Sequence, residues 1–209
     1  MNYSPRFDYT HPIVADLGSV EAARAVIDAL SLPPDVGLRL RQEARSRSSH
    51  HSTRIEGNRL AQGDVASAVM RPAQRRTPDE TEVRNYWRAL EWIEVACEDR
   101  RFVIDEEAMR TLHALILPPA QGRPPKHSTY RSQEIGVIDS SRGRYEYMAP
   151  APGDVPALMR ALADWISSAA AAELPAPVRA AIVAYQFLTI HPFADGNGRA
   201  ARLLEKWFL

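Results

Sequence analysis

The twelve residues 191–202, HPFADGNGRAAR, combine side-chain types that together could carry out phosphate chemistry. His191 is the side chain of this stretch that can exchange a proton near neutral pH, as a general base must. Asp195 supplies a carboxylate, the hard oxygen ligand that Mg²⁺ accepts beside phosphate groups. Arg199 and Arg202 lie three residues apart and so project from the same side of a helix. A proton acceptor, a metal ligand and two cations for phosphate are typical of an enzyme that transfers part of a nucleotide.

The segments on either side of this stretch predict two helices that position it. Residues 178–190 (VRAAIVAYQFLTI) are apolar on nearly every face, which predicts a helix buried in the middle of a domain. After the stretch, apolar residues recur at helical spacing at Ala200, Leu203, Leu204 and Trp207. Gly196 and Gly198 let an anion approach the loop backbone closely, and we expect Asn197 to cap the second helix. The free N–H groups at the start of that helix would then face a bound phosphate.

The stretch contains every fixed position of HPFx(D/E)GNGRxxR, and the chain therefore resembles the Fic family (filamentation induced by cAMP). The resemblance implies a mostly α-helical domain that transfers AMP from ATP to a Ser, Thr or Tyr hydroxyl of a target protein, with release of pyrophosphate. It implies that His191 takes the proton from that hydroxyl and that Asp195 holds Mg²⁺ across the phosphates. Asn197 and Arg199 would stabilise the developing charge, and Arg202 would bind the γ-phosphate.

A second stretch, residues 52–58 (STRIEGN), resembles the inhibitory motif of Fic proteins, (S/T)xxxE(G/N). Ser52, Glu56 and Gly57 match its fixed positions. A glutamate that reached Arg202 would form a charge-assisted hydrogen bond and occupy the space that the terminal phosphate of ATP needs. Ser52, one turn earlier, is placed to hold the helix end, and Gly57 suits a left-handed helix termination. We therefore expect an autoinhibited enzyme.

The residues before this motif are almost entirely polar. Taken alone, residues 42–54 (QEARSRSSHHSTR) are typical of a solvated helix face. Adjacent residues of a helix point in different directions, so we interpret His50 and His51 as solvated side chains and not as metal ligands.

The remainder of the sequence predicts further helices and one hairpin. We expect an irregular lead-in over residues 1–18, followed by helices over 20–30, from 35, over 63–70, from 77, from 105 and over 154–166. Cys97 falls at a core spacing and is interpreted as a small core residue. His113 is interpreted as a hydrogen-bonded structural residue and not as a ligand.

Two short β-prone runs, residues 133–139 and 145–150, flank a polar turn and predict a β-hairpin. Fic proteins carry a flap hairpin at this place, whose edge pairs with an extended target segment. The resemblance therefore assigns target docking to five flap residues: Ile135, Val137, Ile138, Tyr145 and Tyr147. A hairpin that only covers the core is the alternative.

Composition limits the classes of partner. The 209 residues are 45% hydrophobic and carry 26 Lys and Arg against 26 Asp and Glu, so no basic footprint for nucleic acid is visible. The single cysteine excludes an internal disulfide and a cysteine-based zinc site. With no secretory signal and no membrane-length apolar run, we expect a cytoplasmic protein. The sequence is also compatible with a homo-oligomer.

The resemblance also sets the expected domain organisation. We expect an N-terminal helical region over residues 1–100, which carries the inhibitory motif, and a Fic catalytic core over 101–209. Because the sequence stops at the large apolar residues 207–209, we expect the core to be truncated at its C-terminal end.

Three other functions remain open at this stage. The same site could remove AMP from a modified protein, with Glu56 orienting the attacking water. It could transfer a different phosphate-containing group. Outside the enzymes, a regulatory protein could use the nucleotide site as a sensor.

Overall fold

A computed structural model describes residues 3–72, 75–99, 102–118, 126–139 and 144–209 of the chain. In chain order, the helices are α1 (His11–Ala29), α2 (Pro34–Ile55), α3 (Val65–Met70), α4 (Pro78–Glu98), α5 (Glu106–Ile116), α6 (Val155–Ile166), α7 (Ala169–Ala172), α8 (Ala176–Ile190) and α9 (Asn197–Phe208). Short 3₁₀ turns at Gln62–Asp64 and Pro152–Asp154 precede α3 and α6, and two strands, β1 (Gly136–Asp139) and β2 (Arg144–Met148), lie between α5 and α6. The fold is mostly α with one β-hairpin, as predicted.

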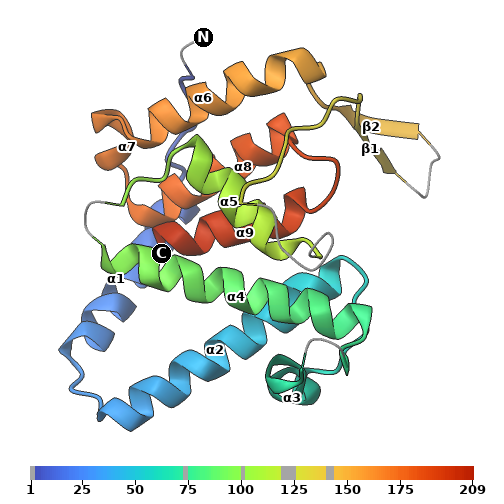
Figure 1. Cartoon of the computed structure of the whole chain (residues 1–209). Coiled ribbons are helices and arrows are strands. Elements are labelled where there is room, and N and C mark those ends of the chain that lie inside the picture. Colours follow the sequence, from blue (N-terminus) through green and yellow to red (C-terminus); the bar gives the residue numbers. More distant parts are fainter. Residues whose placement is uncertain (1–2, 73–74, 100–101, 119–125, 140–143) are drawn as a thin grey trace.

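Helices α8 and α9 form a hairpin at the centre of the molecule, and residues 191–196 form the loop between them (Figure 1). Helices α4, α5 and α6 pack around this pair and share one hydrophobic core with it. The largest fully buried side chains of that core are Tyr86, Met109, Leu112, Ile116, Met159, Leu162, Phe187, Ile190, Phe193, Leu203 and Leu204. The helix hairpin is thus fixed on several sides, which gives the loop a rigid support.

The expectation that α8 is buried on nearly every face is wrong. One face carries Val183 and Phe187 into the core, but Tyr185 is 71% exposed and Leu188 is also exposed. Helices α6 and α9 pack against α8, but the side that carries Tyr185 and Leu188 is exposed, so apolar composition overstated its burial.

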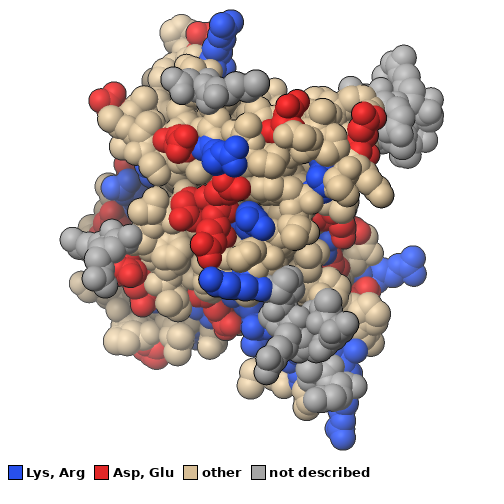
Figure 2. All heavy atoms as spheres, turned by 45° about the horizontal axis from the view of Figure 1, so that its top comes forward, with Lys and Arg blue, Asp and Glu red and all other residues tan. Residues whose placement is uncertain are grey.

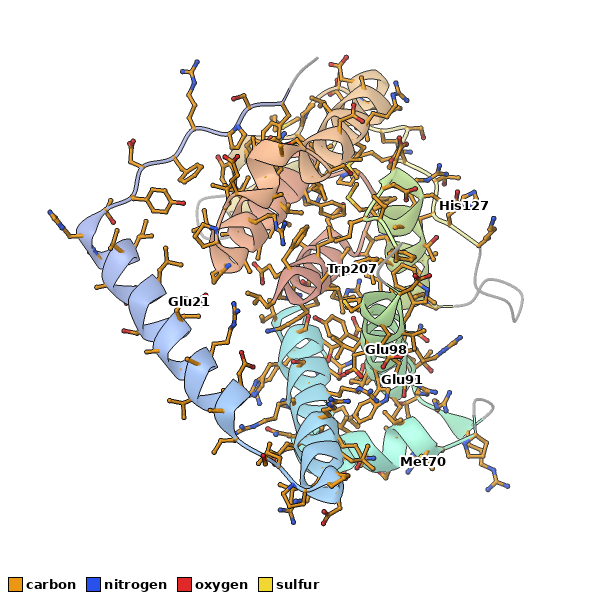
Figure 3. All side chains as sticks on the ribbon, turned by 90° about the vertical axis from the view of Figure 1, so that its left-hand side faces the viewer. Glu21, Met70, Glu91, Glu98, His127 and Trp207 are labelled. Atoms are coloured by element: carbon orange, nitrogen blue, oxygen red, sulfur yellow. The ribbon has the colours of Figure 1, made fainter. Side chains whose placement is uncertain are left out.

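The N-terminal region also differs from the prediction. Helix α1 begins at His11, with Pro12 in its first turn, where the N–H group that proline lacks would have no partner. The helix therefore starts inside the expected irregular lead-in and includes Gly18, whereas the prediction started it at residue 20. No residue of α1 is buried, and Figure 3 shows this helix, marked by Glu21, diverging from α2 and from the helices around Trp207.

Helix α2 is polar in sequence, but it is not solvated on all sides. Ser49, His50, Ser52 and Thr53 are buried where α2 packs against α4 and α9. Burial lowers the pKa of His50, whereas His51 is exposed as expected. The interpretation of this stretch as a solvated face is therefore wrong for its C-terminal half.

Helix α4 begins as the sequence predicts. The Thr77 hydroxyl accepts from the Glu80 N–H, and the Glu80 carboxylate accepts from the Thr77 N–H, which makes a capping box. Ile93 and Ala96 of this helix face the core, but Cys97 is exposed. The interpretation of Cys97 as a core residue is wrong, although it follows the buried Ile93 by one helical turn.

The two strands form an antiparallel hairpin that projects from the edge of the helical body (Figure 1). Gly136 pairs with Met148 and Val137 with Tyr147, and the register then shifts by a bulge. The predicted hairpin is confirmed. Residues 140–143 of its turn lie outside the described part of the chain, as do the side chains of Val137, Ile138 and Tyr145.

The described surface mixes both signs of charge. On the face drawn in Figure 2, acidic and basic side chains lie interspersed. No helix among the described residues is both long enough and apolar enough to span a membrane.

Candidate functional site

His191 lies at the C-terminal end of α8 in a left-handed backbone conformation, with φ 49° and ψ 60°. It is the one described non-glycine residue with a positive φ. Its Nδ1 lies 3.3 Å from the Leu188 carbonyl oxygen. A carbonyl oxygen can only accept, so Nδ1 carries the proton and Nε2 is left unprotonated. Burial lowers the pKa of His191, which favours this neutral form near pH 7.

The loop that follows is closed by Asn197 and Phe193. The Asn197 side chain accepts from the Phe193 N–H at 3.0 Å and donates to the Phe193 carbonyl at 2.8 Å. Gly196 is the N-cap of α9, with φ 79°, and Asn197 is the first helical residue. The prediction that Asn197 caps α9 is therefore wrong, because its amide is used to close the loop.

A stack of rings supports the loop from the α5 side. The His113 and Phe193 rings are stacked, with centroids 3.7 Å apart. Nε2 of His113 lies 2.7 Å from the Asp195 carbonyl oxygen, and Nδ1 lies 2.7 Å from the Ser128 hydroxyl. Burial lowers the pKa of His113 to about 4. The ring is neutral and fully hydrogen-bonded, which confirms its structural interpretation.

The Asp195 carboxylate stands at the mouth of the loop. Its Oδ1 accepts from the Gly196 N–H at 2.7 Å, and its Oδ2 lies 3.1 Å from Nη2 of Arg199. The side chain is nevertheless 79% exposed. It borders two hollows of about 320 and 480 Å³, one toward His113 and the other toward Glu82.

The last turn of α2 ends beside the start of α9. Asn58 N–H donates to the Thr53 carbonyl and Gly57 N–H donates to the Arg54 carbonyl, which is the Schellman pattern of helix termination. Gly57 has φ 96°, the left-handed conformation predicted for it. This ending leaves the Glu56 side chain free to extend toward α9.

Arg202 is held by three acceptors from that turn. Its Nε donates to the Ser52 hydroxyl at 2.8 Å, and Nη2 lies 3.0 Å from the Ser52 carbonyl oxygen and 2.7 Å from Oε1 of Glu56. The predicted pair of Glu56 and Arg202, which are 146 positions apart in the sequence, is present. Ser52 binds Arg202, and not the helix end as predicted.

The Glu56 carboxylate also lies directly over the start of α9. A Cβ placed on Gly198 would meet Oε1 of Glu56 at 2.6 Å. The carboxylate thus occupies the position beside the helix N-terminus where the positive end of the helix dipole attracts an anion.

Arg199 has carboxylate partners on two sides. One is Asp195, and the other is Glu82 of α4, which forms an ion pair with Nη1. Glu82 is itself bound at 2.7 Å by the amide of Asn58, which follows Glu56 by two residues. Nε of Arg199 is buried and has no acceptor among the described residues. Arg199 and Arg202 of α9 are therefore both linked to the end of α2.

Sequence reasoning missed three residues of this arrangement. Glu82 and Asn58 gave no signal, because Glu82 lies 117 residues before its partner Arg199. Arg131, just before the hairpin, donates to the His191 carbonyl oxygen at 2.8 Å. An alignment of sequences would be the ordinary way to find such residues. The hydroxyl of Tyr147, a residue predicted to dock the target, donates to the Thr189 carbonyl oxygen at 2.6 Å.

The donor set suits a metal bound together with phosphate. Among the described residues there is no group of three or more His, Cys, Asp or Glu side chains that could hold a metal ion. Mg²⁺, however, is usually held by one or two carboxylates plus substrate phosphates and water. An exposed Asp195 carboxylate beside a helix N-terminus fits that pattern.

Comparison with known proteins places the chain in a family. The model of the Fic/DOC family matches residues 103–209, about half of the chain. The chain therefore belongs to the Fic/DOC family.

Two curated relatives are proteins named "Protein adenylyltransferase Fic". The protein from Nematostella vectensis is 31% identical over 182 residues, which cover 85% of this chain and 40% of that protein. The protein from Drosophila willistoni is 27% identical over 196 residues, 92% of this chain and 37% of that protein. The chain thus spans well under half the length of these relatives.

Two solved structures share the fold. A Fic family protein from Desulfovibrio desulfuricans G20 superposes with a TM-score of 0.75 and 30% identity, over 99% of this chain and 59% of that one. A Fic domain containing signaling protein from Bacteroides thetaiotaomicron gives a TM-score of 0.77 and 27% identity, over 94% of this chain and 71% of that one.

Proposed function

We propose that the chain is an autoinhibited protein adenylyltransferase that transfers AMP from ATP to a hydroxyl side chain of a target protein. The observation that carries this proposal is the position of Glu56. Its carboxylate lies on Arg202 and against Gly198 at the start of α9, where an anion would bind. The adenylyltransferase names of the relatives support the same reaction class.

The chemistry requires a base near the loop. The target hydroxyl oxygen would attack the α-phosphorus, the bond from the α-phosphorus to the bridging oxygen would break, and pyrophosphate would leave. Nε2 of His191 would accept the hydroxyl proton, because Nδ1 is committed to the Leu188 carbonyl. The first-turn N–H groups of α9 and Arg199 would stabilise charge on the phosphates. Nε–H of Arg199 has no acceptor in the described part of the chain, which supports a phosphate acceptor there.

Asp195 would hold Mg²⁺ against the phosphates through a carboxylate that is 79% exposed. When bound, the ion would neutralise negative charge on the phosphate oxygens. Arg199 fixes the carboxylate from the other side, so its direction is set before substrate arrives.

Inhibition would work by occupation of the γ-phosphate position. Arg202 would bind that phosphate, but the end of α2 supplies it with three acceptors instead. Two of these are the hydroxyl and carbonyl oxygens of Ser52, which carry no charge. Only Glu56 both carries a charge and fills the space over Gly198. Removal of Glu56 would therefore open the phosphate position and leave Arg202 anchored by Ser52.

Target docking would use the hairpin. The edge of a two-stranded sheet has unpaired N–H and C=O groups that an extended peptide can bind. Tyr147 fixes the hairpin to the end of α8 through the Thr189 carbonyl, two residues before His191. A peptide on this edge would be placed at a fixed distance from the base.

The test is intact-mass analysis of the chain and of candidate targets after incubation with ATP and Mg²⁺. Parent, Glu56→Gly and Glu56→Gly/His191→Ala are compared, with ATP labelled either at the α- or at the γ-phosphate. We expect α-label and the mass of one AMP on protein in Glu56→Gly alone. Label from the γ-phosphate would instead indicate phosphoryl transfer. Loss of AMP from a premodified target with the parent, but not with Glu56→Gly, would indicate AMP removal.

A further inference from the structure

Arg131 is a buried arginine whose side-chain hydrogen bonds within the described residues all go to main-chain carbonyl groups. The residue is 5% exposed, and among the described residues no carboxylate forms an ion pair with it. Nε donates to the carbonyl oxygen of His191 at 2.8 Å, Nη1 to that of Gln133 at 2.9 Å and Nη2 to that of Pro150 at 2.5 Å. Its own N–H donates to the Pro192 carbonyl at 3.0 Å. Burial of a charged guanidinium costs free energy of desolvation, which its hydrogen bonds must offset. The groups that accept these bonds therefore indicate what Arg131 holds in place.

The acceptors belong to two parts of the chain. Gln133 lies just before β1 and Pro150 just after β2, so these two carbonyls mark the two ends of the hairpin. His191 and Pro192 begin the loop between α8 and α9. One guanidinium thus joins both ends of the hairpin to the peptide groups of the candidate base.

His191 needs such support because its backbone is strained. A left-handed conformation is disfavoured for a residue with a Cβ and persists only where the surroundings fix it. The His191 N–H is bound by the Phe187 carbonyl at 2.9 Å, and its side chain by the Leu188 carbonyl at 3.3 Å. The bond from Arg131 fixes the third group, the His191 carbonyl oxygen.

We propose that Arg131 is a positioning residue that holds His191 in its left-handed conformation and fixes the hairpin relative to it. The proposal rests on the proposed function, in which the hairpin presents the acceptor hydroxyl and His191 takes its proton. A planar guanidinium with five donors can reach separate carbonyls at fixed angles, whereas the single ammonium group of a lysine cannot. The role therefore requires the shape of the arginine and not only its charge.

Arg131 also acts on His191 through its charge. Burial is the larger cause of the lowered His191 pKa, the Leu188 carbonyl opposes it, and the positive charge of Arg131 adds to it. Burial lowers the pKa of Arg131, and the nearby Tyr147 on β2 and Glu134 before β1 oppose that shift. Removal of the charge should therefore raise the pKa of His191, an effect that a purely structural role of Arg131 would not require.

The experiment compares Arg131→Lys and Arg131→Met in the Glu56→Gly background, with Arg160→Met, an exposed arginine on α6, as the control. Folding is checked by thermal melting, and nucleotide binding is measured with an ATP analogue whose α–β bridge is a methylene group. The His191 pKa is measured by NMR on histidine-labelled protein. Hydrogen exchange reports on the hairpin.

We expect Arg131→Met to bind the analogue within about threefold of the parent and to lose transfer by at least about a hundredfold, the size of a lost general base. Its His191 pKa should rise and its hairpin amides should exchange faster. Arg131→Lys should keep the low pKa and still lose at least about tenfold in transfer. Arg160→Met should match the parent in all measurements.

Transfer by both Arg131 variants within about threefold of the parent, with an unchanged His191 pKa, would overturn the proposal. So would equal losses of transfer and of analogue binding, which would indicate general damage to the fold. If the Glu56→Gly parent transfers no AMP, the proposed function fails by itself. The NMR and exchange measurements still decide whether Arg131 controls His191 and the hairpin.

Discussion

At the scale of single residues, His191 is the most direct test of the site. His191→Ala removes Nε2 but leaves the Asn197–Phe193 closure and both arginines of α9 in place. Transfer should fall by about a hundredfold to ten-thousandfold, whereas analogue binding and thermal stability should change little. Single-turnover AMP transfer in the Glu56→Gly background measures this. Transfer at the parental rate would show that another group takes the proton.

The inhibitory role proposed for Glu56 can be tested by comparing its substitution with that of Arg54, which lies in the same turn of α2. Glu56→Gly should raise AMP incorporation, including self-modification, by about tenfold to a hundredfold, equivalent to about 1.4 to 2.7 kcal/mol in the productive complex. The side chains of Glu56 and Arg202 are 34% and 26% exposed, so the gain comes from the cleared phosphate position more than from an unpaired buried charge. Arg54→Ala, an exposed change in the same turn, is the control and should remain inhibited. Incorporation in Glu56→Gly no higher than in the parent, with ATP binding unchanged, would exclude autoinhibition by Glu56.

Asp195 can be tested through the metal. Asp195→Ala removes the carboxylate proposed to hold Mg²⁺ and a partner of Arg199. We expect transfer to fall and the Mg²⁺ concentration for half-maximal transfer to rise by at least about tenfold, the scale on which loss of one charged ligand weakens a site. The measurement is a Mg²⁺ titration of transfer in the Glu56→Gly background. An unchanged titration curve would mean that Asp195 only shapes the turn through the Gly196 N–H.

At the scale of elements, periodicity predicted the helices that bury one apolar face. Helices α5, α6 and α9 are strongly amphipathic and begin near the expected residues. Only the second half of α1 was predicted, as a helix over residues 20–30, and its first half was missed because the helix buries no residue and has no core-facing apolar side to mark it. The buried side of α2 escaped prediction because Ser49, His50 and Ser52 are polar, and hydropathy does not register burial achieved by polar packing.

In the candidate site, too, some residues could be predicted from the sequence and others could not. His191, Asp195, Arg199 and Arg202 lie in one stretch, so local pattern was sufficient to find them. Residues that act through distant partners have no local pattern, and Arg131 was therefore missed. The wrong assignment of the Asn197 cap has a similar cause, because a residue that closes a loop and a residue that caps a helix are identical in sequence.

The link between α2 and α4 gives a prediction at this scale. The Asn58 amide bonds Glu82 and the Asp79 carbonyl, and its oxygen accepts from the Leu60 N–H. Asn58→Ala should lower the free energy of unfolding by about 1 to 3 kcal/mol, because buried polar groups lose their partners.

Asn58→Ala should also activate transfer partially, since the turn that carries Glu56 loses its anchor on α4. Urea unfolding and AMP incorporation measure the two effects. The control is Arg59→Ala, whose side chain is exposed beside the same turn. Destabilisation with no activation would separate the anchor from inhibition.

At the scale of the whole molecule, His113 links the core to the loop between α8 and α9 and gives the fold an acid sensitivity. Its pKa is about 4 in the folded protein against 6.5 in the unfolded chain, because burial opposes the charged form. Above pH 6.5 both states are neutral at this residue, and its contribution is constant. As the pH falls from 6.5 to about 4, only the unfolded chain binds the proton, so the free energy of unfolding decreases. The total loss is about 3 kcal/mol, and below about pH 4 it does not grow further.

Urea unfolding between pH 7.5 and 4.5 should therefore show a falling stability in the parent protein. The slope should be smaller in His113→Asn, which keeps a polar side chain between Ser128 and the Asp195 carbonyl but has no proton to bind. The control is His11→Gln, which changes an exposed histidine at the start of α1, a helix with no buried residue, and should retain the parental slope. NMR titration of the His113 ring gives an independent measurement in the intact fold. A ring that titrates near 6.5, or equal slopes in His113→Asn and the parent, would show that His113 is not the group that limits stability in acid.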